Sequence, residues 1–456
     1  MTKQSYVSKR YPATSVVHTY SAIYQNSDMA SSTVPPIAII GGGPCGLTLA
    51  RLLETAGINY VVFERDPSPT PTLRSQGGTL DIHNETGQEA LRRAGLHDQF
   101  KSLARCDATT MTLMDSQGGS RASLGDDNGE ERPEIDRQQL RQILLDSIPA
   151  ERIRWGKTIN SVDRKEDEHR GGAYAWTLNF RDDSTETGFR LIVGADGAWS
   201  KIRPLITDAK PIYSGKSFLG GRISLGNPQY ESAQQMAGKG TAMVMSAKST
   251  LAVQQMSDAS YRVYMGILAP EGLTQAGGDA DPKDMIKART TLLGPGGFYA
   301  DWANDFRDLI EASEEPWRPW PLYRLDNDLF SSEERFTGGK GEQSVHCGWK
   351  RTPGIVLLGD AAHLATPNGE GVNQAMYDSL VLFDQIIAEA GATEGGPYDW
   401  ETDAAALERA IVAYEIEMRP RAYEHIQSSI DMEEMMYAND GAQKMIEAFQ
   451  AFHKSD

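Results

Sequence analysis

The sequence predicts an α/β protein in which a parallel sheet is joined to a second β-sheet and to a C-terminal helical segment. Three observations lead to this fold class. A glycine-rich loop separates two short apolar runs and a helical stretch within residues 37–63. Two later apolar runs, at 191–194 and 354–358, each lead into a step that joins Gly and Asp. Between them, residues 210–270 alternate apolar and polar positions, which is typical of strands with one covered face.

Length and composition describe a globular chain with more than one lobe. The protein has 456 residues, of which 39% are hydrophobic and 24% are charged, and a chain of this length exceeds one ordinary core. No apolar run approaches the roughly 20 residues of a membrane helix, so we expect no stable membrane insertion. The net charge of −18 argues against a nucleic-acid partner, because a polyanion would be repelled. We expect a monomer that acts on a small molecule.

The cysteine and histidine spacing argues against disulfides and structural metal. Cys45, Cys106 and Cys347 form no CxxC pair, and the eight histidines form no ligand cluster. We therefore expect a reducing, cytoplasmic location and no metal. Residues 1–33 are rich in Ser, Thr and Tyr but lack the apolar core of a secretory signal. We expect them to form a disordered N-terminal tail.

The first apolar runs and their loop form a β-α-β pattern. Gly41, Gly43 and Gly46 give the spacing GxGxxG between a predicted strand and a predicted helix, and Glu64 closes the next strand. In such a unit the glycines let a pyrophosphate approach the helix N-terminus, and the acid accepts ribose hydroxyls. The sequence therefore predicts a Rossmann-like dinucleotide site, with Cys45 as a small filler in the loop. The expected elements are a strand at 37–40, a helix at 47–56 and a strand at 60–63.

A GxGxxG unit does not distinguish NAD from FAD, but two later stretches do. They read LIVGADGAWSKIR at 191–203 and GIVLLGDAAHLATPNGEGVN at 354–373. In this order the three motifs resemble the single-component, FAD-dependent aromatic hydroxylases called class A flavoprotein monooxygenases, over nearly all of residues 35–450. Within that class the likeness is greatest to the tetracycline-inactivating flavin monooxygenases. It is carried by GGTLDIHNETGQEALRRAGL, RQQLRQILL and YEIEM, which begin at residues 77, 137 and 414.

The resemblance implies an FAD-dependent monooxygenase that takes electrons from NADPH and transfers one oxygen atom of O2 to an electron-rich carbon. Glu64 and Arg65 would hold the adenosine end of FAD, and Asp81 would lie near the flavin ring. Arg137 would lie along the cofactor, and Asp360 would bind its ribityl or pyrophosphate region. The full set of expected cofactor contacts is Gly41, Gly43, Pro44, Cys45, Gly46, Glu64, Arg65, Asp81, Arg137, Asp196, Gly359, Asp360, Pro367, Gly369, Gly371, Val372 and Asn373.

One departure from the family concerns the loop at Pro367. The family pattern is Pro-x-x-Gly-x-Gly, whereas here Gly369 and Gly371 follow Pro367 with one residue fewer. The loop leads into a predicted helix whose positive end can face the flavin ring and stabilise the charge of the reduced flavin. His363 is expected to shape the preceding turn, and no catalytic base is assigned.

A second departure concerns the substrate. Tetracycline-inactivating members hold the drug with Gln, Arg and His side chains, and the positions that match here are Gly220, Thr241 and Tyr264. Strand alternation places Phe218, Gly220 and Arg222 on one face. There Arg222 would be the one long cation, suited to a phenolate or enolate oxygen; alternatively, it pairs with an acid at the domain seam. The expected substrate contacts are Phe218, Gly220, Arg222 and Tyr264.

The expected function is hydroxylation of a phenolic or enolic polycycle, such as a polyketide-like secondary metabolite or a tetracycline-type compound. Two alternatives remain open. A flavin-dependent halogenase is suggested by Trp317 and Trp320, although their positions are three apart where those of halogenases are two apart, and packing at a domain seam also explains them. The other alternative is a non-catalytic FAD-binding protein. The expected domains are a tail at 1–33, an FAD-binding domain at 34–210 and 336–400, a substrate-binding β-sheet domain at 211–335 and a C-terminal helical segment at 401–456.

Overall fold

The computed structural model describes residues 34–71, 77–125, 129–166, 174–331, 348–390 and 398–453. The tail expected at residues 1–33 and Cys347 lie outside these ranges. Every helix in the described ranges is either too short or too polar to cross a lipid bilayer.

A five-stranded parallel sheet forms the centre of the first lobe. Its strand order is β17-β11-β1-β2-β7, and every pairing is parallel. Since β17 comes from far along the chain, the sheet is assembled from discontinuous segments. The strands predicted at 37–40 and 60–63 are confirmed as β1 and β2. The bounds are β1 (Ile37–Ile40), β2 (Tyr60–Phe63), β7 (Ile153–Arg154), β11 (Leu191–Gly194) and β17 (Ile355–Leu357).

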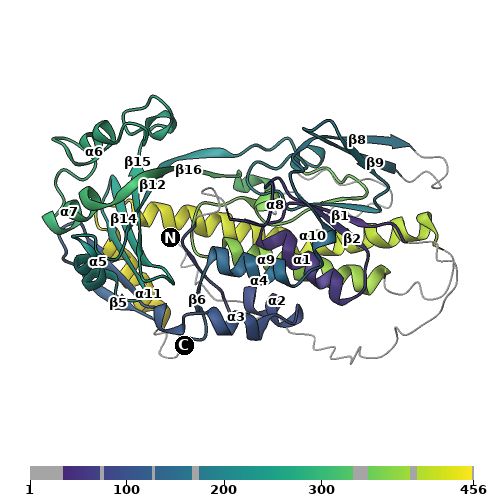
Figure 1. The fold of residues 1–456 in the computed structure, drawn as a ribbon, viewed down its shortest axis with the longest axis horizontal. Coiled ribbons are helices and arrows are strands. Elements are labelled where there is room, and N and C mark those ends of the chain that lie inside the picture. The colour runs from purple at the N-terminus through teal and green to yellow at the C-terminus, as the bar shows by residue number, and fades with distance from the viewer. Residues whose placement is uncertain are drawn as a thin grey trace. The chain divides into compact units, whose positions relative to one another are not determined.

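Helices pack beside this sheet in the order α1, α9, α10, each against the next (Figure 1). Helix α4 buries Leu140, Ile143 and Leu144, which the spacing of an amphipathic helix places on one face. The bounds are α1 (Pro44–Thr55), α2 (Gly87–Arg93), α3 (His97–Leu103), α4 (Arg137–Asp146), α8 (Asp360–His363), α9 (Gly371–Ala390) and α10 (Trp400–Met436). Smaller sheets are formed by β3 (Thr79–Asp81) with β6 (Glu134–Asp136), and by β8 (Ile159–Glu166), β9 (Tyr174–Phe180) and β10 (Thr185–Thr187).

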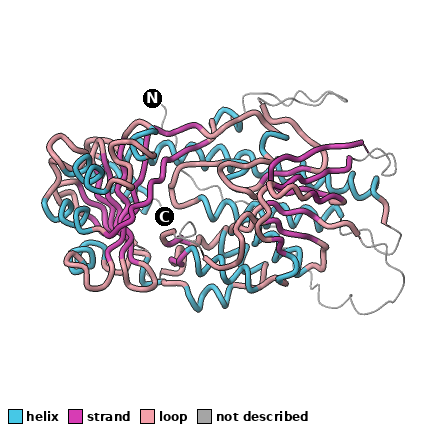
Figure 2. The backbone as a smooth tube through the Cα atoms, turned by 45° about the horizontal axis from the view of Figure 1, so that its top comes forward, coloured by secondary structure: helices cyan, strands magenta, loops and turns pink. Residues whose placement is uncertain are grey.

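A seven-stranded sheet, drawn in magenta with the other strands in Figure 2, forms the second lobe in the order β16-β12-β15-β14-β13-β4-β5. Helices α5, α6 and α7 bury apolar side chains against one of its faces. Two of its strands, β4 and β5, come from the segment that we assigned to the FAD-binding domain. They join here because β4 pairs in parallel with β13 and covers that strand's free edge. The bounds are β4 (Met111–Asp115), β5 (Ala122–Leu124), β12 (Ile212–Ile223), β13 (Thr241–Met245), β14 (Ser249–Gln255), β15 (Tyr261–Leu268), β16 (Glu314–Arg324), α5 (Tyr230–Ala237), α6 (Met285–Leu293) and α7 (Asn304–Ala312).

The C-terminal segment links the two sheets. Helix α10 contacts α9, and α11 (Gly441–His453) packs on β4 and β13 through a methionine-rich cluster. Pro420 lies inside α10, and the helix continues through it. The proline ring frees the carbonyl of Ile416, and because Ile416 is exposed, water can satisfy that carbonyl.

Candidate functional site

In the glycine loop after β1, protein atoms crowd the positions of Gly41 and Gly46, whereas the position of Gly43 is open. A Cβ at Gly41 would overlap the carbonyl oxygen of Ala195, and a Cβ at Gly46 would overlap that of Gly41. Gly41 also has a φ of +114°, which favours glycine. A Cβ at Gly43, in contrast, would meet no protein atom within 4 Å. Two glycines therefore serve the packing of the loop, and Gly43 leaves space at the N-terminus of α1 where a phosphate can approach.

Glu64 supports this loop from the end of β2. Its buried carboxylate accepts hydrogen bonds from the backbone N–H of Gly42, at 2.5 Å, and of Asp66, at 2.9 Å. Arg65, the other residue expected at the adenosine end, is exposed to solvent. Glu64 therefore lies at the end of β2, as the β-α-β pattern predicted, and its carboxylate orients the glycine loop.

Arg141 of α4 was not identified from the sequence, although it lies one helical turn after Arg137. Its Nε donates to the carbonyl of Gly42 at 3.2 Å, and its Nη2 pairs with Asp66 at 3.3 Å. The guanidinium also lies 5.6 Å from the ring centre of Trp155. The i, i+4 spacing of two arginines on one helix was the signal that could have identified it.

Asp360 follows β17 and begins the short helix α8. Its side chain is exposed to solvent, yet the surrounding protein raises the pKa of the carboxyl by desolvation, while the charges of His363, Arg137 and Arg203 oppose that rise. Exposure and partial desolvation together are expected for a residue in a concave surface. The buried guanidinium of Arg203 donates to the carbonyls of Asp360 and of the next residue. The charge of Arg137 thus acts on Asp360, and both residues stay predicted FAD contacts.

A buried ionic cluster lies beneath this turn. Asp378 of α9 is 0% exposed and accepts from the backbone N–H of Gly359 at 2.9 Å. Its carboxylate lies 2.6 Å from His363 Nε2 and 3.0 Å from Arg421 Nη2. Burial raises the pKa of Asp378, but the charges of His363 and Arg421 lower it to about 2. The sequence did not predict this cluster, because its members come from the turn after β17, from α9 and from α10.

Asp196 and Cys45 flank the glycine loop. Asp196 Oδ2 accepts from the backbone N–H of Lys201 at 2.6 Å, while its Oδ1 is buried without a hydrogen-bond partner. Burial raises the pKa of this carboxyl. An orphaned acceptor beside an open glycine loop fits a ligand that carries hydroxyl groups. Burial also raises the pKa of the Cys45 thiol, which agrees with a filler and not with a reactive thiolate.

The loop that begins at Pro367 lies beside β3. A Cβ at Gly369 would lie 3.5 Å from Asp81 Oδ2, and a Cβ at Gly371 would meet no protein atom within 4 Å. Asn373, expected as a cofactor contact, is buried with its amide engaged: Oδ1 accepts from His83 N at 2.8 Å, and Nδ2 donates to Asp81 O at 2.9 Å. Its side chain therefore joins α9 to β3. The loop, Asp81 and the open N-terminus of α9 meet in one place, as the resemblance implied.

The open face of the seven-stranded sheet carries the expected substrate residues. Phe218, Gly220 and Arg222 are half-buried, whereas Leu219 and Gly221 between them are buried on the opposite face. The register places Tyr264 opposite Gly220. The three residues therefore share a face, as alternation predicted.

Of the two expectations for Arg222, the structure shows the one in which it pairs with an acid. Arg222 pairs with Asp258 at 2.5 Å, with 37% of the Arg222 side chain and 55% of the Asp258 side chain exposed, so its guanidinium is held by Asp258. It is also not the one long cation, because Arg262 lies opposite Arg222 and Arg318 lies opposite Gly220 in the register. The pairing with Asp258 could not be predicted from strand alternation, because Asp258 belongs to the turn between β14 and β15.

Tyr264 lies where the two lobes meet. A Cβ at Gly78, just before β3, would overlap its hydroxyl oxygen. Burial raises the pKa of Tyr264, and the nearby charges of Arg262, Arg137 and Arg318 oppose that rise. The hydroxyl therefore lies in positive surroundings at the edge of the candidate cofactor site.

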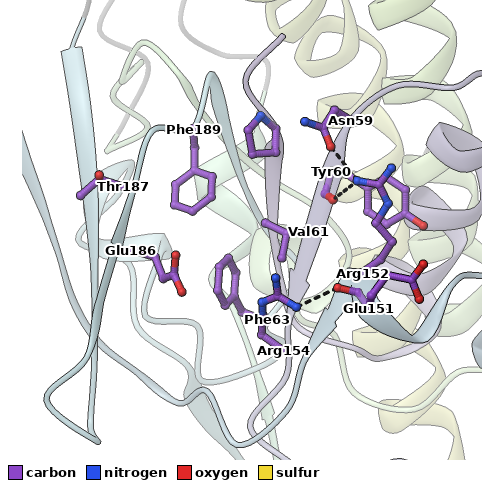
Figure 3. Close-up of a pocket in the computed structure, with 11 residues that line it drawn as sticks. Asn59, Tyr60, Val61, Phe63, Glu151, Arg152, Arg154, Glu186, Thr187 and Phe189 are labelled. Atoms are coloured by element: carbon purple, nitrogen blue, oxygen red, sulfur yellow. Dashed lines mark hydrogen bonds between the residues drawn. The ribbon is translucent and has the colours of Figure 1, made fainter. Parts of the chain in front are cut away.

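Other features of the molecule do not point to a site. Trp317 is buried in the apolar core of the second lobe and Trp320 is partly exposed on β16, so the two do not pack together at a seam. Among the described residues, no group of three His, Cys, Asp or Glu side chains could hold a metal ion. A shallow hollow of about 250 Å³ lies along β2, near Asn59 and Arg152 (Figure 3). It is not the dinucleotide site, because the glycine loop is at the opposite end of β1, and Arg152 already donates to Asn59 at 2.6 Å.

Comparison with known proteins agrees with this geometry. Residues 35–217 match the family described as FAD binding domain. The monooxygenase penA of Penicillium thymicola is 30% identical over 440 residues, which cover 90% of this chain and 97% of that protein. Klebsiella pneumoniae HpxO, solved with FAD and uric acid, is 20% identical with a TM-score of 0.66, covering 92% of this chain and 93% of that one.

The particular likeness to tetracycline-inactivating enzymes is not supported. The tetracycline destructase Tet(51) is similar with a TM-score of 0.60 over 92% of this chain and 97% of that one, but it is only 16% identical. Such a likeness shows a common fold. The resemblance therefore holds for the wider group to which the Penicillium protein belongs, and not for the tetracycline-inactivating members in particular.

Proposed function

Because the chain belongs to the FAD-dependent monooxygenases, we propose that it uses NADPH and O2 to hydroxylate a phenolic or enolic polycyclic small molecule of secondary metabolism. One observation carries this proposal: the glycine loop is open at Gly43, and the charge of Arg137 acts both on Asp360, after β17, and on Tyr264, on the open face of the second sheet. When bound, FAD supplies the oxygen chemistry. The chain supplies binding, orientation and the exclusion of water.

We assign the FAD contacts in order along the cofactor, from the adenosine end to the flavin ring. The pyrophosphate would lie against Gly43 at the N-terminus of α1, with Glu64 near the adenosine ribose. Asp360 would accept from the hydroxyls of the ribityl chain. The ring end would lie beside Asp81 and Gly371, where the positive end of α9 stabilises the negative charge of the reduced flavin. The open space at Gly43 and Gly371 supports this order.

The substrate would lie against Phe218, Gly220 and Tyr264. Gly220 supports this placement because it presents no side chain, and a Cβ there would meet its nearest protein atom only at 3.8 Å. A flat ring system can therefore approach the sheet. The guanidinium charges of Arg262, Arg137 and Arg318 around Tyr264 favour a substrate that carries an anionic oxygen, since charge-assisted hydrogen bonds are the stronger ones. Arg222, held by Asp258, would mark the outer rim.

A screen of NADPH oxidation against aromatic polyketides and tetracyclines, with NADH in parallel and product masses recorded, tests the proposal. We expect a yellow protein whose NADPH consumption rises with the true substrate and whose product gains one oxygen atom. A flavin that NADPH does not reduce would indicate a non-catalytic binding protein. A product that gains chlorine from added chloride would indicate a halogenase.

A further inference from the structure

A histidine lies between two carboxylates at the loop before α9, and the assignments above give it no role. His83 Nε2 lies 2.8 Å from Asp81 Oδ2, and His83 Nδ1 lies 3.3 Å from Glu370 Oε1. The histidine side chain is 10% exposed, whereas the two acidic side chains are 30% and 29% exposed. His83 therefore connects the end of β3 to the loop from the protected side, while both acids are more exposed than the histidine.

The geometry requires a charged ring. A neutral imidazole donates through one nitrogen only, so two carboxylates are satisfied together only by the imidazolium. Burial lowers the pKa of His83, but Asp81 and Glu370 raise it to about 9. Burial also raises the pKa of Glu370, which His83 then lowers to about 2. At neutral pH the group is thus one cation between two anions.

The charges around this group do not replace that cation. Arg132 acts on both His83 and Glu370 but is exposed. Glu134 lies opposite Asp81 in the β3–β6 pairing and adds a further acid. His425 of α10 acts on Glu370, yet burial lowers its pKa to about 3, so it is neutral. Among the described residues around Asp81 and Glu370, His83 is therefore the buried cation.

We propose that His83 is a positioning residue whose bonds to Asp81 and Glu370 hold the Pro367–Gly371 loop against β3, in the geometry that FAD binding needs. The inference rests on the proposed placement of the flavin ring beside this loop. Without the imidazolium the two carboxylates repel each other, and the loop moves away from β3. Asn373 joins α9 to β3 independently of this charge, so removal of the imidazole leaves the surrounding fold in place.

Titration of the apoprotein with FAD tests the inference. At pH 7 we expect His83→Asn to weaken FAD binding about tenfold, because a hydrogen-bonded ion contact is lost. His97→Asn is the matched control: His97 contacts Gln88 and Phe100 on α2 and α3, away from the loop, and its FAD affinity stays at the wild-type value. Failure of the wild type itself to bind FAD would refute the proposed function, whereas wild-type affinity in His83→Asn would refute this inference.

The pH dependence separates a charged clamp from mere packing. Because the folded pKa of His83 is raised, its contribution is complete below about pH 6.5 and is lost as the pH rises through about 9. The ratio of the His83→Asn Kd to the wild-type Kd should therefore fall toward one above pH 9, and a ratio independent of pH would overturn the inference. Glu370→Gln, which is nearly isosteric, provides a second route. In ¹³C-histidine NMR the resonance that titrates near pH 9 should shift to lower pH in this variant, and an unshifted resonance would refute the clamp.

Discussion

Replacing Asp378 by Asn should destabilise the protein strongly, although Asp378 touches no expected ligand. The carboxylate is completely buried and holds the backbone N–H of Gly359, the imidazole of His363 and the guanidinium of Arg421. Asparagine keeps the size of the side chain but removes its charge. The guanidinium of Arg421 would then remain buried without its counter-ion.

Two arguments give a similar loss in the free energy of unfolding. Breaking a buried ion pair by removing one partner costs about 3–5 kcal/mol. The pKa of Asp378 falls from 3.8 to about 2, and a shift of that size corresponds to about 2 kcal/mol of stability. We therefore expect a loss of about 2–5 kcal/mol at pH 7. Since the folded pKa is depressed, this contribution is present above about pH 4 and is lost as the pH falls through about 2.

Urea denaturation of the apoprotein at pH 7 measures this loss, and the same helices provide the control. Glu389 of α9 pairs with Arg409 of α10 at 2.6 Å, with 34% and 59% of their side chains exposed. Glu389→Gln should cost less than about 1 kcal/mol, because exposed ion pairs contribute little. A loss in Asp378→Asn no larger than that of the control would refute the argument that the buried cluster stabilises the turn at Gly359. We also expect FAD affinity to fall in Asp378→Asn alone.

Three further outcomes test the site. Gly46→Ala should destabilise the fold by about 1–3 kcal/mol, because its Cβ would overlap the carbonyl oxygen of Gly41. Gly43→Ala, in contrast, should keep the wild-type Tm and weaken FAD binding in a fluorescence titration. Equal effects of the two variants would contradict the proposed path of the pyrophosphate. Asp360→Ala should lower FAD affinity while the apoprotein keeps its Tm, and an unchanged Kd would remove Asp360 from the site. Tyr264→Phe should raise the substrate KM or uncouple NADPH oxidation from oxygen insertion. Arg222→Ala should change the KM less than about twofold, because Asp258 already holds its guanidinium. A larger effect on KM in Arg222→Ala than in Tyr264→Phe would move the proposed pocket toward Arg222.

The parts of the site that the sequence predicted are those set by local geometry. The strand at 37–40, the glycine loop and Glu64 follow one another within a single β-α-β unit, so spacing alone places them. The pairing of β4 with β13 could not be predicted, because it joins segments far apart in the chain through backbone hydrogen bonds that leave no side-chain pattern. Arg222 shows the same limit: alternation gave its face, but the turn that carries Asp258 decides where its charge is held.

Helix α10 connects the cofactor side to the substrate side as a single body. Arg421 contacts Asp378 beneath the turn at Gly359. Three turns later Glu433 pairs with Lys216 of β12 at 3.1 Å, and both side chains are largely buried. Since both contacts lie on one helix, we expect a change in either pair to alter the distance between the turn at Gly359 and β12. We therefore expect catalytic alignment to depend on helix residues that touch neither proposed ligand.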